Sequence, residues 1–92
     1  MAVVTMKSMP KKHDQIRYSL VSEGALVIHH SRGELKTLNP VGGFILDLAD
    51  GTRTVQEIAE RVMAAFRVEK AEAEADTLAF LEDLLKHDII EV

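Results

Sequence analysis

Apolar and polar side chains alternate along residues 15–38, with the period of two that is typical of half-buried strands. Turn-forming residues at 22–24 and 31–33 divide this region into three segments. Both connections are short enough for antiparallel hairpins, so we predict a three-stranded antiparallel sheet. The predicted strands are residues 15–20, 25–30 and 34–38.

The apolar spacing changes to a helical period after the third predicted strand. Asn39 and Pro40 suit the N-cap and the first turn of a helix. Thr54, with Glu57 three residues later, has the spacing of a capping box and predicts the start of a second helix. The three predicted helices are residues 41–48, 55–66 and 70–87.

The third predicted helix carries an apolar arc of about 160° on a helical wheel, wider than the ~100° stripe that covers a core. Leu81 and Leu84 lie in the middle of the arc and are predicted to face the core. One margin consists of Leu78 with Leu85, and the other of Phe80. Either margin can be open to a ligand, or both can belong to the core.

Strands followed by three helices predict an α+β domain whose arrangement is similar to a winged helix-turn-helix. We assign residues 15–92 to this domain, with residues 89–92 as a short extension that packs on it. Residues 1–14 show no apolar period and are predicted to form a flexible N-terminal tail.

The composition fits one folded domain. The chain has 92 residues, of which 47% are hydrophobic, which is enough for a packed core. The absence of cysteine excludes a disulfide framework, a thiol nucleophile and a cysteine-ligated metal centre. No apolar run has the character of a signal peptide or the length of a membrane span. We therefore expect a cytoplasmic protein with no membrane partner.

The charge argues against nucleic acid as a partner. The formal net charge is −4 at pH 7, whereas a nucleic-acid-binding domain normally carries a basic patch for the phosphates. The one basic cluster, Lys7 with Lys11 and Lys12, lies in the predicted tail. A winged-helix DNA-binding regulator is therefore the alternative function, not the first.

No group of residues has the pattern of a catalytic, cofactor-binding or metal site. His29 and His30 are adjacent on a predicted strand, so their side chains point to opposite faces and cannot easily bind one ion. Glu72 and Glu74 lie near the start of the third predicted helix, where the helix dipole favours negative charge. We therefore predict that the protein is not an enzyme and has no cofactor.

The last predicted strand offers a different kind of site. It follows the second strand through a short hairpin, so it is predicted to be a sheet edge, with unpaired backbone groups that another chain can bind. Its charged residues, Glu34 and Lys36, are also compatible with protection of that edge. Together with the apolar arc, the edge predicts a groove for an extended peptide. The candidate binding residues are Glu34, Leu35, Lys36, Thr37, Leu38, Leu78, Phe80, Leu81 and Leu85.

A series of short motifs follows the third predicted strand. They are Leu-Asn at 38–39, glycine at 42, Ile-Leu-Asp-Leu at 45–48, Asp-Gly-Thr-Arg-Thr at 50–54, and Phe-Leu at 80–81 with leucine at 84. In this order and spacing, the motifs resemble the PqqD-like family over about residues 16–92. Two features depart from the family pattern. The strand GELKTL, residues 33–38, lacks the aromatic residues that many members carry, and Asp88 stands where glycine is common.

The resemblance implies a fold of three strands and three helices, and a role as a peptide chaperone, or recognition element, for ribosomally made and post-translationally modified peptides. It implies that the leader of a precursor peptide binds as an added strand against the third strand, beside the third helix. It also implies a modifying enzyme as partner, often a radical SAM protein. The precursor, the enzyme, and whether the pathway is that of pyrroloquinoline quinone (PQQ) stay open. A homodimer, or an exchange of elements between protomers, would use the same edge.

Overall fold

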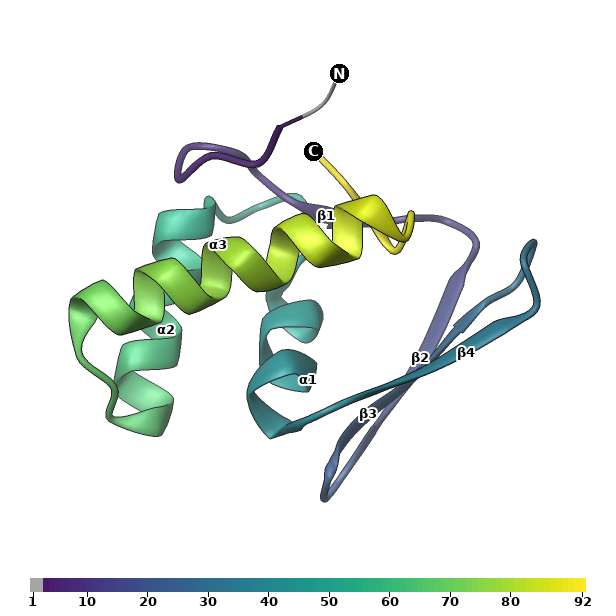
Figure 1. Cartoon of the computed structure of the whole chain (residues 1–92), viewed down its shortest axis with the longest axis horizontal. Coiled ribbons are helices and arrows are strands. Elements are labelled where there is room, and N and C mark those ends of the chain that lie inside the picture. Colours follow the sequence, from purple (N-terminus) through teal and green to yellow (C-terminus); the bar gives the residue numbers. More distant parts are fainter. Residues whose placement is uncertain (1–2) are drawn as a thin grey trace.

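In the computed structural model, which describes residues 3–92, a small sheet packs against three helices (Figure 1). The elements are β1 (Lys11–Lys12), β2 (Ile16–Val21), β3 (Gly24–His29), β4 (Glu34–Leu38), α1 (Pro40–Leu48), α2 (Val55–Phe66), α3 (Lys70–Lys86) and β5 (Ile90–Glu91). β2, β3 and β4 form an antiparallel sheet in that order, and β1 pairs with β5. The predicted α+β fold is confirmed.

The three-stranded sheet has one buried and one exposed face. On β3, Val27 and His29 are buried, whereas Leu26 and Ile28 are exposed. Val27 is the register partner of Lys36, so Lys36 lies on the buried side of the sheet. This side faces the helices, and the register therefore decides which side chains of β4 can take part in a site there.

Side chains cap the first two helices as predicted. Asn39 Oδ1 accepts a hydrogen bond from the backbone N–H of Gly42 at 2.7 Å, and Pro40 is the first residue of α1. Before α2, Thr54 Oγ1 accepts from the N–H of Glu57 at 3.1 Å, and Glu57 Oε1 accepts from the N–H of Thr54 at 2.9 Å. These bonds satisfy N–H groups that have no acceptor inside a helix.

The core lies between the inner face of the sheet and the helices. Its fully buried side chains include Ile45, Leu46, Ile58, Leu81 and Leu84. Leu81 and Leu84 confirm that the middle of the apolar arc faces the core. Gly42 lets α1 approach α3 closely, because a Cβ at this position would lie 2.8 Å from the ring of Phe80.

The N-terminal segment differs from the predicted tail. Val4 is only 4% exposed, and β1 pairs with the buried β5 residue Ile90. The carbonyl oxygen of Ser8 accepts a hydrogen bond at 2.9 Å from the N–H of Val55, in the first turn of α2. Residues 3–14 are therefore part of the packed domain, and residues 1–2 lie outside the described residues. Much of this contact runs through the main chain, which leaves no hydrophobic period in the sequence.

Lys12 caps the carboxyl end of α1. Its Nζ lies 3.1 Å from the carbonyl oxygen of Leu46 and 2.9 Å from that of Ala49. Carbonyl groups at a helix end have no donor inside the helix, and a cation there also complements the helix dipole. Burial, the largest effect, lowers the pKa of Lys12. Lys12 is thus part of the folded domain and not of the exposed basic cluster that the sequence predicts.

Candidate functional site

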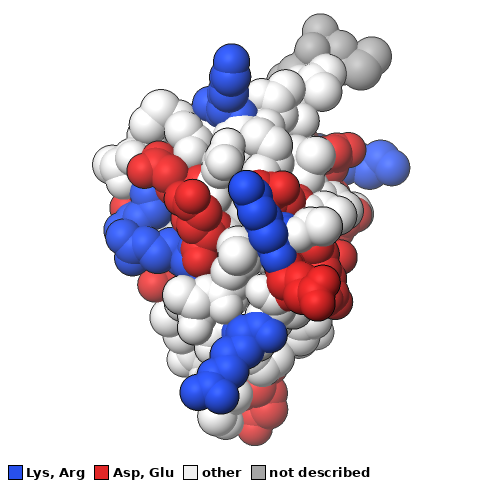
Figure 2. Space-filling model, turned by 90° about the vertical axis from the view of Figure 1, so that its left-hand side faces the viewer, with Lys and Arg blue, Asp and Glu red and all other residues white. Residues whose placement is uncertain are grey.

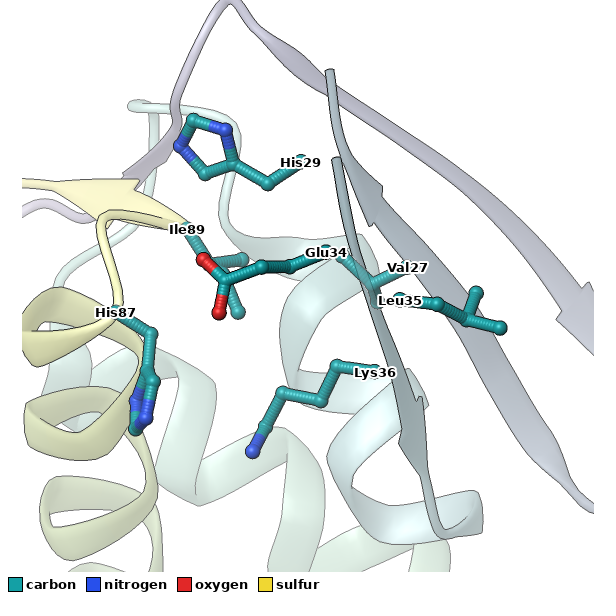
Figure 3. A pocket seen from close by; sticks show the side chains of 7 residues that line it. All are labelled: Val27, His29, Glu34, Leu35, Lys36, His87 and Ile89. Carbon is teal, nitrogen blue, oxygen red and sulfur yellow. The ribbon is translucent and has the colours of Figure 1, made fainter. Parts of the chain in front are cut away.

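β4 forms one edge of the sheet, since among residues 3–92 only β3 pairs with it. Alternate residues of an antiparallel strand direct their N–H and C=O groups away from the partner strand, so β4 leaves free backbone groups along this edge. Glu34 and Lys36 point toward α3, whereas Leu35 points to the opposite face (Figure 3). A second chain that paired with β4 would place every other side chain next to α3.

α3 forms the second wall of a groove beside β4. Phe80, Asp83 and His87 follow one line along the helix, because positions i, i+3 and i+7 share a face. Lys36 Nζ lies 3.7 Å from Asp83 Oδ2 and connects the two walls. The ring of Phe80 packs against Gly42, which closely follows β4 in the chain. The two walls thus extend from this contact to His87.

A cavity of about 200 Å³ lies where β4 begins and α3 ends (Figure 3). It is lined by Val27, His29, Glu34, Leu35, Lys36, His87 and Ile89. Val27 and Ile89 are buried and give the cavity an apolar floor, while Glu34, Lys36 and His87 supply polar groups. Pockets for drug-sized ligands have volumes of about 300–1,000 Å³, so this cavity fits one amino-acid side chain.

Polar contacts tie the hairpin before β4 to the end of α3. Arg32 donates a hydrogen bond to Asp88 and lies 3.6 Å from the Glu34 carboxylate. His87 Nδ1 donates to the main-chain carbonyl of Asp83 at 2.9 Å. The charged partners are about half exposed, so each ion pair contributes about 1 kcal/mol or less. Together these contacts connect the start of β4 to the end of α3.

The structure separates the candidate residues that the sequence assigns to the third helix. Leu81 is 0% exposed, so it belongs to the core and not to the groove surface. Phe80 is half-buried on the side of α3 that carries Asp83, which faces β4. Leu78 and Leu85 are half-buried on the other side of the buried stripe. The margin next to β4 is therefore that of Phe80.

The β4 candidates also divide between the two faces of the sheet. Glu34 and Lys36 line the cavity, and Leu38 is buried against the core. Leu35 is 67% exposed and, like Thr37, lies on the outer face. Through their backbone all five residues belong to the free edge, and their contact with a peptide stays a prediction.

Sequence reasoning missed Asp83 and His87 as groove residues. Their spacing from Phe80 was a usable signal, because it places all three residues on one line of the helix. Val27 and Ile89 had no such signal, since only the tertiary fold brings them to the same cavity.

Residues 3–92 include no group of three or more His, Cys, Asp or Glu side chains that could hold a metal ion. His29 is buried and His30 exposed, as the strand alternation predicts.

A hydrogen bond from the Tyr18 hydroxyl to Asp47, at 2.8 Å and outside the groove, raises the pKa of Tyr18. None of the helices in the described range is long and apolar enough to cross a bilayer. The groups that the groove offers to a ligand are the free backbone groups of β4 and the side chains that line the cavity.

Figure 2 shows the face over α2 and the start of α3, where lysine and arginine side chains are interleaved with acidic ones. A DNA-reading helix needs a continuous basic surface around it for phosphate contacts. The exposed arginines of this region, Arg61 and Arg67, share it with Glu57 and Glu60. The charge distribution therefore gives no support to the alternative of a DNA-binding regulator.

Comparison with protein families gives a match over residues 24–90 to the family described as coenzyme PQQ synthesis protein D (PqqD). A comparison with curated proteins gave no match. Solved structures of similar fold include a lasso peptide synthetase B1 complexed with the leader peptide. This neighbour has a TM-score of 0.80 and 18% identity, and the alignment covers 92% of this chain and 100% of that one.

Two further structures have the same TM-score of 0.80. TbiB1 in complex with the TbiA(beta) leader peptide is 23% identical, with 88% of this chain and 94% of that chain covered. The PqqD truncation of Methylobacterium extorquens PqqCD, a stand-alone recognition element for ribosomally synthesised and post-translationally modified peptides, is 21% identical, with 98% and 96% covered. These likenesses agree with the fold described above.

Proposed function

The chain belongs to the PqqD family, and from this premise we propose that it binds the leader segment of a ribosomally made precursor peptide and presents it to a modifying enzyme. The leader would add as a strand to the free edge of β4 and place alternate side chains in the groove beside α3. The observation that carries the proposal is this juxtaposition of a free strand edge with a groove on the same side.

The recognition would combine two kinds of contact. Backbone hydrogen bonds to β4 supply affinity for any extended segment, and side-chain contacts in the groove supply selectivity. Phe80 offers an apolar contact at one end, and the cavity beside Glu34 accepts one side chain at the other. Strand pairing with a few such anchors supports a dissociation constant of about 1 μM or tighter, roughly −8 kcal/mol.

The solved neighbours support the choice of ligand. Two of them, the lasso peptide synthetase B1 and TbiB1, are described as complexes with a leader peptide. A third is described as a stand-alone recognition element for modified peptides. By extension, the role we propose is that of a binding module without chemistry of its own. Its partner would be a modifying enzyme, for which we favour a radical SAM protein acting in the cytoplasm.

The test is a titration of the ¹⁵N-labelled protein with the N-terminal segment of a short precursor encoded beside its gene. We expect chemical-shift changes along β4 and on the Phe80–His87 side of α3. We also expect slower amide exchange at alternate residues of β4, because only alternate N–H groups point to the free edge. Changes confined to α2, or slower exchange without this alternation, would contradict strand addition.

A further inference from the structure

We infer that the cavity beside Glu34 selects a basic side chain, lysine or arginine, of the bound peptide. The inference rests on the proposed function and names the class of residue that the groove recognises. A strand paired with β4 directs alternate side chains to the same side as Glu34 and Lys36. One of these side chains lies next to the cavity mouth and can enter it.

The shape of the cavity fits a long side chain with an apolar stem. The floor consists of Val27 and Ile89, which present hydrocarbon surface, and the volume of about 200 Å³ suits one extended side chain. Lysine and arginine bury their methylene stems on such surfaces and keep the charged head at a polar rim. The polar rim here is formed by Glu34, Lys36 and His87, with the ring of the buried His29 nearby (Figure 3).

Two groups at the rim can accept a hydrogen bond from a ligand. The Glu34 carboxylate accepts no hydrogen bond from residues 3–92, and its ion pair with Arg32 is long, at 3.6 Å. His87 uses Nδ1–H for the carbonyl of Asp83, so in its neutral form its Nε2 is an acceptor. Lys36 Nζ, which also lines the cavity, lies 3.7 Å from Asp83 Oδ2, and the buried Nε2 of His29 has no hydrogen-bond partner among residues 3–92. A donor that enters beside Glu34 therefore meets two acceptors, the Glu34 carboxylate and Nε2 of neutral His87.

The charges around the cavity point in the same direction. Glu34 and Lys36 line the cavity and belong to a set of ion pairs that extends beyond its lining. This set has three carboxylates, Glu34, Asp83 and Asp88, and two cations, Arg32 and Lys36. The cations already contact all three carboxylates, so one negative charge is left in excess when His87 is neutral. A basic side chain would balance this charge, whereas an acidic side chain would increase the excess and would have to displace Asp83 from Lys36.

The test uses a display library of peptides with about ten randomised residues, selected on the full chain. We expect lysine or arginine to be enriched at one position of the selected peptides. Replacement of that residue by methionine should weaken binding to the unchanged protein about fivefold, the upper range for a half-exposed charge pair. The same replacement should change binding to Glu34→Gln by less than about twofold.

The matched control is Glu60→Gln, which removes one exposed carboxylate from α2, away from the cavity. It should retain the fivefold difference between the lysine and methionine peptides. Selected peptides that shift β4 resonances but show no basic position, or an equal loss in Glu34→Gln, would overturn this inference and leave strand addition intact. A selection in which no peptide binds at β4 would overturn both.

Discussion

Lys12 Nζ and the carbonyl oxygen of Ala49 lie 2.9 Å apart, which joins the N-terminal segment to the end of the first helix. Lys12→Met keeps the length of the side chain but removes the donor, so the carbonyl groups at the end of α1 lose a charged partner. We expect a loss of about 1–2 kcal/mol in the free energy of unfolding, measured by urea denaturation. Lys7→Met, an exposed position, should change it by less than about 0.5 kcal/mol. Equal effects of the two substitutions would contradict the capping role.

The capping box at the start of α2 predicts a pH dependence. The backbone N–H of Thr54, followed by its hydroxyl, lowers the pKa of Glu57. A lowered pKa in the folded state means that this contribution to stability is present above the unfolded value of about 4.3 and is lost as pH falls through the folded value.

Carboxylate titration by NMR should show the Glu57 pKa moving up toward its ordinary value in Thr54→Val, because the hydroxyl is lost. Thr52→Val should leave the Glu57 pKa unchanged, since Thr52 bonds to Asp50 instead. A Glu57 pKa that is the same in Thr54→Val and the unchanged protein would argue against the hydroxyl as a cause.

Arg67 ends α2 in the left-handed region, with φ of 54°. Glycine adopts this conformation without the steric cost that other residues incur. Arg67→Gly should therefore raise the free energy of unfolding by about 0.5–1 kcal/mol, seen as a higher midpoint in urea. Arg61→Gly, inside the same helix, should lower it by about 1 kcal/mol. A destabilised Arg67→Gly would show that the arginine side chain makes a compensating contact.

Binding through the backbone of β4 predicts different effects of two substitutions at one position. Leu35→Pro removes an N–H group and distorts the edge, so it should abolish peptide binding. Leu35→Lys changes only a side chain that points away from the groove, and its affinity should stay within about twofold. Isothermal titration on variants whose fold is confirmed by circular dichroism separates the two. Unchanged affinity of a folded Leu35→Pro would count against the edge-strand model.

The two margins of α3 give a further test. Phe80→Ala should weaken peptide binding about tenfold, because it removes the apolar contact beside β4. Leu78→Ala removes a half-buried apolar side chain from the opposite margin and should leave the affinity within about twofold. Fluorescence anisotropy of a labelled peptide measures both. The reverse order of effects would place the binding surface on the other side of the helix.

The sequence predicted those parts of the fold that local chemistry determines. Alternation gave the three strands, and Asn39, Pro40 and Thr54 gave the helix starts, since their side chains or ring act on the adjacent turn. The middle of the arc on α3 followed from the helical period alone. These features depend on residues that are close in the chain.

Features that depend on residues distant in the chain were harder to predict from the sequence. Residues 3–14 pack mainly through main-chain bonds, which leave no sequence pattern, and Lys12 bonds to carbonyl groups more than thirty residues away. The choice between the margins of α3 required the position of β4, which the contact between Lys36 and Asp83 reveals. The groove could be predicted in outline, but its lining could not.

The pairing of β1 with β5 has a consequence for how this domain can be built into larger proteins. Lys11 is the register partner of Glu91, so the segments that lead to the two ends of the chain run side by side (Figure 1). Domains with neighbouring ends tolerate insertion into a loop of a host protein and circular permutation. Insertion of this kind would leave the edge of β4 uncovered, because β4 belongs to the other sheet.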